Sequence, residues 1–349
     1  MAAGLEWECP PLVLFIDDVS GNSTKQWNVH YSCYLSNGGL PHTAVEKESH
    51  IRFVVTSPHA SPMEIITAIC DEIKKTGGTT LVKAWDCIHQ RYILIRLWLL
   101  FLPGDNLMQA ELCSHIGLMG NHLCHCCHAG GTKEFKESDG GYPTLMSPGT
   151  PRTVEETRKA VMNQLIMATH AAAEKPLKEV MTSSGVKDSL AMPTISRLIA
   201  IGKLLRRSTP QHKALSPEGV AQQLHEEFMK RKDLTMINPL LRMARFDVHK
   251  DTPIEALHTH LLSIVKHFWA QTVWSGLNIP NIMADYMCRY HGGLIGKHFK
   301  TISQVMAFAV CSLVEEKLQT AWFAIGRLTV MIWEVEIKNL KQYTARISI

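Results

Sequence analysis

Residues 12–17 read LVLFID, a short apolar run that ends in an acid. Two more runs of strand length follow it, residues 27–36 (WNVHYSCYLS) and residues 51–56 (IRFVVT). The turn residues Asn37, Gly38 and Gly39 close the second run, and Ser57 and Pro58 close the third. Apolar, β-branched and aromatic runs that turn residues separate are typical of strands. We therefore expect three consecutive strands near the N-terminus.

Residues 62–75 have the pattern of a helix that begins with Pro62 and ends before Gly77. Two strand-like runs follow, residues 79–86 and residues 92–102. The second is almost continuously apolar, as expected for a strand that is covered on both faces. Three strands, a helix and a further apolar strand follow the RNase H-like layout, in which the last strand lies beside the first. Residues 79–86 are an addition to that layout.

The second half of the chain differs in character. Residues 129–152 are rich in Gly, Pro, Ser, Lys and Glu, and this composition predicts a long loop. Helical patterns then dominate, at residues 154–174, 193–205, 217–231, 253–273, 298–319 and 320–341. We therefore expect an α/β protein with an RNase H-like mixed sheet in residues 1–128, a linker in 129–152 and an α-helical region in 153–349.

Composition limits the classes of function. The 349 residues are 46% hydrophobic and 19% charged, which is typical of a globular protein. A formal net charge of +4 permits contact with DNA without requiring it. Ten cysteines without a secretory signal indicate a reducing, intracellular location, with which a nuclear one is compatible. Uninterrupted apolar runs are too short to span a bilayer, and nothing indicates a small-molecule cofactor. The oligomeric state stays open.

Acidic residues follow two of the expected strands. Asp17 and Asp18 end the first strand, and Asp105 comes just after the long apolar one. If these strands are neighbours, the carboxylates meet at one edge of the sheet, where they could hold Mg²⁺ for phosphodiester cleavage. The alternative is structural: Asp17 and Asp18 would belong to a turn, and Asp105 would cap the helix that follows it. Spacing alone favours the structural interpretation.

Cysteine and histidine are concentrated in residues 113–128. The pair Cys124 and Cys127 has the CxxC spacing of a zinc knuckle. The third ligand could be His115 or Cys113, and the fourth could be His128 or the distant His258. The alternative is a set of inert or surface thiols. Redox chemistry of the thioredoxin type is disfavoured, because the motif does not follow the first strand of a βαβ unit.

The expected helix at 253–273 begins after the N-cap Asp251, with Pro253 in its first turn. Its histidines, His258 among them, lie along an apolar face, where a histidine is more often structural than a ligand. Small groups of lysine and arginine elsewhere are either solvated helix faces or a track for the DNA backbone. No helix-turn-helix or zinc-finger spacing accompanies them.

Several phrases together resemble the Tnp2-like transposases of CACTA-type elements, which are abundant in fungal genomes. They are FIDDVSGNSTKQWNVHYSCYLSNGGLP, HIRFVVTSPHASPMEI, LFLPGDNLMQAELCSHIGLMGNHLCHCCHAGGTKEF and DVHKDTPIEALHTHLLSIVKHFW. The resemblance covers about residues 12 to 337. The family's first Asp, Trp and Asn-x-x-Leu-Pro phrase match Asp17 or Asp18, Trp27 and residues 37–41. Its second Asp, His and CxxC match Asp105, His115, Cys124 and Cys127. Its Pro-Glu-x-x-His helix is one residue out of step with Pro253, Glu255 and His258.

The resemblance implies DNA strand cleavage and transfer by carboxylates that hold Mg²⁺, with a third acid after the helical region. No segment here resembles that last acidic helix, so we expect a truncated derivative of the RNase H-like class. Because two-metal chemistry needs both ions in place, we expect the protein not to cut DNA. The alternative is a non-catalytic, zinc-stabilised module that contacts nucleic acid or protein.

Overall fold

The computed structural model describes residues 4–20, 29–77, 81–208, 213–230, 236–274, 294–311 and 313–347. The chain divides into two compact units, residues 1–253 and residues 254–349. Trp27 lies outside the described residues. Within the part that is described, no helix has both the length and the apolar character that a bilayer crossing requires.

The first unit contains a four-stranded mixed sheet in the order β4-β3-β2-β7. Its strands are β2 (Pro11–Ser20), β3 (Val29–Asn37), β4 (Arg52–Ser57) and β7 (Trp98–Phe101). Antiparallel pairing joins β2 to β3 and β3 to β4, whereas β7 runs parallel to β2. The three expected N-terminal strands are therefore confirmed. The last strand lies beside the first, as the strand order had predicted.

The alternation of side chains along β2 explains how this sheet is covered. Leu12, Leu14 and Ile16 alternate toward one face and are buried in the main core. Helix α2 (Pro62–Gly77) contributes Ile66 and Ile73, among others, to the same core. Its N-terminus is stabilised by Ser61, whose backbone N–H donates to the Glu64 carboxylate at 2.8 Å. The predicted helix at 62–75 is thus present and joins the sheet to the rest of the core.

The apolar run at 92–102 is divided between two strands, so the expectation of one long strand is wrong. Strand β6 (Arg91–Ile95) belongs to a small sheet of order β1-β6-β5, with β1 (Trp7–Glu8) and β5 (Val82–Asp86). Arg96 and Leu97 separate β6 from β7, and the Leu97 N–H donates to the Thr76 hydroxyl at 3.0 Å. Tyr92 and Trp98 are exposed, so this run is not covered on both faces.

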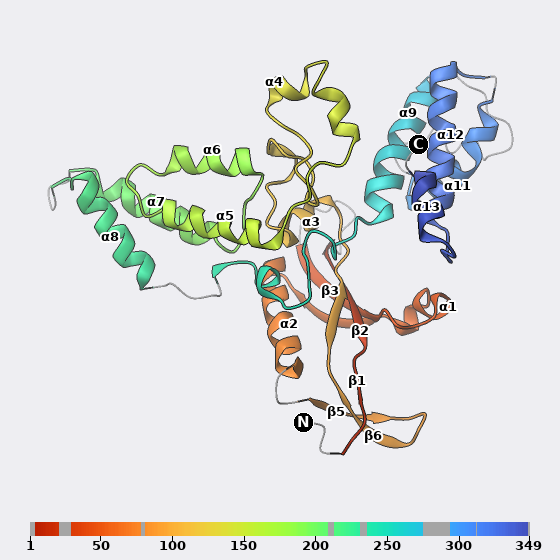
Figure 1. Cartoon of the computed structure of the whole chain (residues 1–349), viewed down its shortest axis with the longest axis horizontal. Coiled ribbons are helices and arrows are strands. Elements are labelled where there is room, and N and C mark those ends of the chain that lie inside the picture. Colours follow the sequence, from red (N-terminus) through yellow and green to blue (C-terminus); the bar gives the residue numbers. More distant parts are fainter. Residues whose placement is uncertain are drawn as a thin grey trace. The chain divides into compact units, whose positions relative to one another are not determined.

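The parallel pairing nevertheless continues from one sheet to the other. Trp7 is paired with Leu94 in β1 and β6, and Pro11 is paired with Trp98 in β2 and β7. The same two segments therefore run side by side through both sheets. The small sheet forms the opposite end from the one at which β2 reaches Asp17 (Figure 1).

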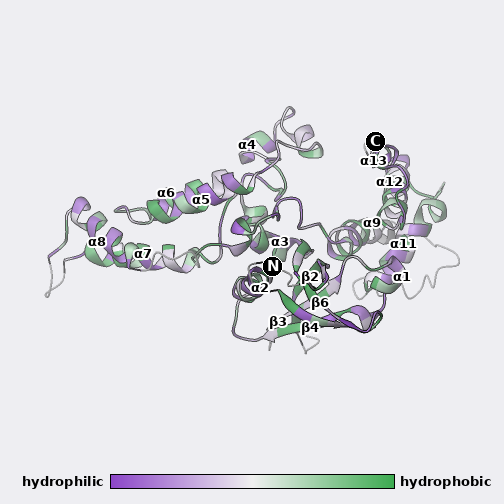
Figure 2. Cartoon of the chain, turned by 60° about the horizontal axis from the view of Figure 1, so that its bottom comes forward, coloured by the Kyte–Doolittle hydropathy of each residue, from purple (hydrophilic) through white to green (hydrophobic). Residues whose placement is uncertain are grey.

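Helices make up the rest of the first unit. The long ones are α5 (Val154–Met167), α6 (Glu174–Ser184), α7 (Met192–Leu205) and α8 (Pro217–Met229). Figure 2 shows hydrophilic and hydrophobic residues interspersed along them, as amphipathic helices require. Their buried residues, such as Val161 and Leu224, belong to the same core as the sheet. The compact units therefore do not follow the divisions expected at residues 128 and 152, because residues 153–253 share this core.

Short elements occupy the connections. They are α1 (His42–Val45), η1 (Glu48–His50), α3 (Asn106–Leu112), η2 (Gly117–Met119), α4 (Lys133–Lys136), η3 (Tyr142–Met146) and η5 (Pro239–Arg242). Two of them, α4 and η3, lie inside the predicted 129–152 loop. That loop is therefore irregular in part only.

The second unit is helical and has its own core. A π-helix, η6 (Leu257–Val265), continues into α9 (Lys266–Trp274), and α11 (Gly296–Ala309), α12 (Glu316–Ile332) and α13 (Leu340–Ile347) follow. Trp269, Phe299 and Trp322 are fully buried in this core. The predicted helix at 298–319 is divided between α11 and α12, and the one at 320–341 between α12 and α13.

Candidate functional site

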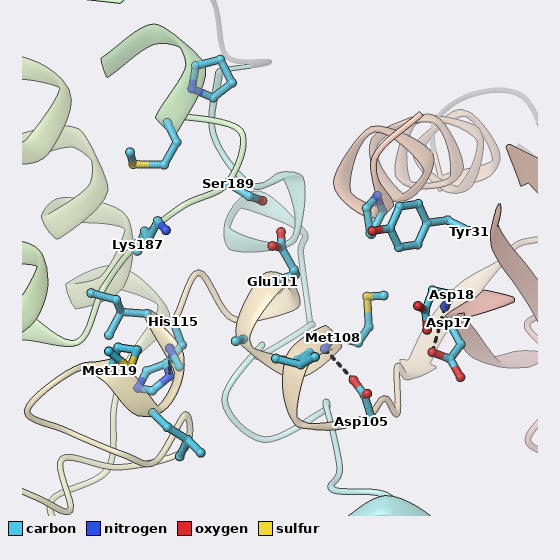
Figure 3. Close-up of a pocket in the computed structure, with 18 of the residues that line it drawn as sticks. Asp17, Asp18, Tyr31, Asp105, Met108, Glu111, His115, Met119, Lys187 and Ser189 are labelled. Atoms are coloured by element: carbon cyan, nitrogen blue, oxygen red, sulfur yellow. Dashed lines mark hydrogen bonds between the residues drawn. The ribbon is translucent and has the colours of Figure 1, made fainter. Parts of the chain in front are cut away.

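The predicted acidic residues line one open cleft. Asp17 and Asp18 occupy the C-terminal part of β2, and Asp105 follows β7, which is parallel to β2. Parallel neighbours end at the same edge of a sheet, so these carboxylates meet there. The cleft has a volume of about 860 Å³. Figure 3 shows Asp17 and Asp18 on one wall and Asp105 on the loop that leads into α3.

Each of two acids already accepts a local hydrogen bond. Asp105 is the N-cap of α3, and its Oδ1 accepts from the Met108 N–H at 2.7 Å. Asp17 Oδ1 accepts from the Asp18 N–H at 2.8 Å. The capping role weighed for Asp105 is therefore confirmed. A cap uses one carboxylate oxygen, so it does not by itself prevent a second role.

Sequence patterns did not reveal two further charged residues of this cleft. Glu111 lies on α3, and Lys187 lies close to the start of α7 in the chain; both line the cleft (Figure 3). Glu111 follows Asp105 on the same short helix, a signal that could have suggested it. Lys187 has no such signal, because only the packing of the helical region against α3 brings it here.

The carboxylates do not form a complete metal site. Among the described residues, no three His, Cys, Asp or Glu side chains are grouped so that they could hold a metal ion. Mg²⁺ prefers octahedral oxygen ligands, and two-metal cleavage needs carboxylates on both sides of the ions. Within the described residues, the carboxylates of this cleft are therefore not grouped in the way that a two-metal site requires.

The cysteine-rich segment brings three of its thiols together. Cys124, Cys126 and Cys127 line a second cavity of about 610 Å³ with His249. Cys124 Sγ accepts from the Cys126 N–H at 3.3 Å. Hydrogen bonds from the Cys126 thiol, then from backbone N–H groups and the Cys127 thiol, lower the pKa of Cys124 to about 4. These hydrogen bonds favour the thiolate form of Cys124, which is the form that binds metals.

Two of the other predicted ligands point elsewhere. Cys113 is buried, and its Sγ lies 3.0 Å from the Val248 carbonyl oxygen and 3.2 Å from the Thr252 hydroxyl oxygen. Burial raises the pKa of this thiol to about 12. His115 donates from Nε2 to the His122 carbonyl at 3.0 Å and accepts at Nδ1 from the Gly117 N–H. Neither ring nitrogen of His115 is left to bind a metal.

The remaining two candidates have acidic partners. His128 Nε2 lies 3.0 Å from Glu156 Oε1, and His258 Nδ1 lies 2.5 Å from Glu255 Oε1. His258 also belongs to the second compact unit, whereas the cysteines belong to the first. Of the six predicted ligands, the structure thus brings together Cys124 and Cys127.

Arg152 is a residue of this region that sequence patterns did not indicate. It is 3% exposed, and its Nε donates to the carbonyls of Cys124 and Cys127 at 3.1 and 3.2 Å. Its Nη2 is buried without a hydrogen-bond partner in the described structure. Burial lowers the pKa of Arg152, whereas the charges of Glu156 and Cys124 act in the opposite direction. The Arg152 guanidinium thus stabilises the backbone of the cysteine-rich loop through these hydrogen bonds.

No protein-family model matches the chain, and no curated protein matches it significantly.

Proposed function

We propose that this protein derives from a DNA transposase of the RNase H-like class and that it does not cleave DNA. The observation that carries the proposal is the cleft at the end of β2 and β7. Asp17, Asp18 and Asp105 line this cleft, and carboxylates at the edge of a sheet support descent from a metal-dependent nuclease. The sequence phrases that resemble Tnp2-like transposases support the same origin.

The side-chain arrangement supports the loss of activity. Within the described residues the acids do not converge as a group of three that could hold a metal ion. Two-metal cleavage stabilises both the attacking and the leaving oxygen, so a site that lacks a ligand loses most of its rate. We expect the cleft to have kept one property of the parent site, weak binding of a divalent cation, because carboxylates still line it.

Two measurements on the full chain test this proposal. Labelled duplex DNA is incubated in Mg²⁺ or Mn²⁺ with the wild type and with Asp105→Asn, and calorimetric titration measures binding of Mn²⁺ to both. Asn is a good N-cap, so this substitution removes the charge and keeps the helix end. We expect no cleavage by either protein and weak Mn²⁺ binding that Asp105→Asn reduces.

Each other result has a clear meaning. DNA cleavage by the wild type that Asp105→Asn abolishes would show that the protein is an active nuclease, and it would overturn the proposal that the protein does not cleave DNA. Mn²⁺ binding that is absent, or that is unchanged in Asp105→Asn, would remove the evidence that this cleft descends from a metal site.

A zinc-stabilised binding module is the second candidate. Cys124, Cys126 and Cys127 line one cavity, and this favours the module, but as they stand their thiols are not grouped as a metal site among the described residues, so zinc would have to draw the ligands together. If zinc is present, we expect about one equivalent per chain and a lower melting temperature after chelation. Cys124→Ser should lose the metal, whereas Cys311→Ser, at an exposed cysteine of the second unit, should retain it. Protein that folds without zinc and is unaffected by chelators would exclude this candidate.

A further inference from the structure

A separate pocket lies at the end of the large sheet opposite the acidic cleft. It has a volume of about 620 Å³ and lies where α2 ends and β7 begins. Trp7 and Trp98 line it, and they remain 56% and 38% exposed. Ile73, Leu97 and Met243 supply more apolar surface. The pocket therefore has a largely apolar wall with two accessible indole rings.

The charged residues of this pocket are all basic. Lys74, Arg96 and Arg245 line it, and no Asp or Glu is among its described lining residues. Lys74 is paired with Asp71 at 3.3 Å, so part of its charge is already balanced. Arg96 and Arg245 are exposed at the chain surface. An apolar wall with cations beside it suits a ligand that is both planar and anionic.

The same surface continues along the small sheet. Trp7 and Lys83 are the two cross-strand partners of Leu94, so their side chains share one face. Trp85 and Tyr92, two residues further along, lie on that face and are about half exposed. The Trp85 and Tyr92 rings are arranged edge to face, with their centres 5.0 Å apart. Lys83 Nζ lies 4.1 Å from the centre of the Tyr92 ring.

The acids of this sheet do not neutralise the aromatic face. Glu8 alternates with Trp7 and therefore faces the other side. Asp86 likewise alternates with Trp85, and both Asp86 and Glu6 are paired with Arg91. The result is a track of aromatic rings with basic residues between them, from Trp98 through Trp7 to Trp85 and Tyr92.

We propose that this track binds a single strand of nucleic acid, with bases stacked on the indole and phenol rings and phosphates held by Arg96, Arg245 and Lys83. Stacking platforms flanked by cations bind single strands with little sequence preference, because every base has a π-face. A free nucleotide shares this chemistry, but it would occupy the pocket alone. The continuation onto the small sheet favours a strand. The proposal does not depend on the acidic cleft or on its activity.

Fluorescence anisotropy of a labelled oligothymidylate with the full chain tests the proposal. Trp7→Ala and Trp85→Ala should each weaken binding roughly fivefold or more. Arg96→Gln should weaken binding and reduce the dependence of log K on log salt by ~0.7. Tyr142→Ala, at a comparably exposed aromatic residue of η3, is the matched control and should bind like the wild type. Circular dichroism establishes that each variant is folded.

Competitors and cross-linking separate the alternatives. We expect thymidine monophosphate and polyglutamate to compete poorly, and we expect a 5-iodouracil oligonucleotide to cross-link within residues 82–98 or at Trp7. Equal competition by the nucleotide would restrict the ligand to the pocket and overturn the strand proposal. Equal competition by polyglutamate would indicate a general polyanion surface. Binding that none of the track variants weakens, or cross-links elsewhere, would also overturn it.

Discussion

His115 illustrates how a residue that resembles a metal ligand serves the fold instead. Both of its ring nitrogens are engaged, one with the His122 carbonyl and one with the Gly117 N–H. That arrangement requires the neutral ring. Burial, and secondarily the positive charge of Arg152, lower the pKa of His115 to about 4. The residue therefore links the fold's stability to pH.

A pH dependence of stability follows for His115. A histidine with a depressed pKa stabilises the fold above its unfolded pKa, and this contribution is lost as pH falls toward the folded pKa. With the unfolded value near 6.5, we expect a loss of about 2 kcal/mol between pH 7 and pH 5 from this residue. Urea unfolding at both values measures it. His115→Gln should reduce the difference, whereas the exposed His170→Gln should leave it unchanged. An unchanged difference in His115→Gln would contradict this account.

Asp188 is a second residue with a structural task. Its carboxylate is buried and accepts from the Ser114 hydroxyl and from the backbone N–H groups of Leu190, Ala191 and Asn238. Desolvation is the largest influence on its pKa and raises it despite these donors. Asp188 thus ties the end of α3 to the start of α7 and to η5.

We expect Asp188→Asn to destabilise the protein by about 1–3 kcal/mol. The amide nitrogen that replaces one carboxylate oxygen would face backbone donors, and these would be left without acceptors. Chemical denaturation measures the loss, and the exposed Asp139→Asn is the control. A free energy of unfolding within ~0.5 kcal/mol of the wild type would show that these donors find other partners.

Among elements, α3 carries part of the acidic cleft. Asp105 is its N-cap and Glu111 lies within it, and both line the cleft. The helix is short, so its position depends on its cap and on its buried residues Met108 and Leu112. The role of Asp105 as a cap can therefore be separated from any role as a carboxylate.

Substitutions at Asp105 make this separation. We expect Asp105→Ala to lower the free energy of unfolding by about 1 kcal/mol, because the Met108 N–H loses its acceptor. Asp105→Asn should retain most of that stability, since Asn caps well. Thermal unfolding of the two variants in parallel is the measurement. Equal losses in both would mean that the charge, rather than the cap, stabilises α3.

At the scale of the whole molecule, two separate cores are present. One joins the large sheet to α2 and α5–α8, and the other fills the helices of residues 254–349. Each buries its own large side chains. A cavity in one core is therefore expected to loosen the elements that line that core.

We expect Ile302→Ala, at a fully buried position of α11, to destabilise the second unit by about 2–5 kcal/mol. Phe308→Ala on the same helix removes a larger side chain that is 78% exposed, and it should have little effect. Hydrogen exchange by mass spectrometry should show faster exchange in peptides from α11 and α12. The exchange rate of peptides from α5 and α7, in the first unit, should be unchanged. Faster exchange in these peptides as well would show that the two units unfold as one cooperative unit.

Local patterns predicted the strands β2, β3 and β4, helix α2 and the positions of most later helices, because alternation and helical spacing are properties of short segments. The order of elements allowed Asp17 and Asp105 to meet at one edge of the sheet only if their strands were neighbours, and the pairing of β2 with β7 meets that condition. Sequence alone also predicted that Cys124 and Cys127 lie near each other, because only two residues separate them in the chain; their role as zinc ligands stays a prediction.

Only the tertiary structure decided the rest. The break between β6 and β7 falls at Arg96 and Leu97, where the charged Arg96 interrupts the apolar run, but only the tertiary structure decides which neighbour each half pairs with. Lys187 reaches the cleft because of contacts between segments distant in the chain. The aromatic track arises for the same reason, since strand pairing places Trp7 beside residues more than eighty positions further along the chain. Such contacts follow from how the whole chain buries its surface, which no local pattern specifies.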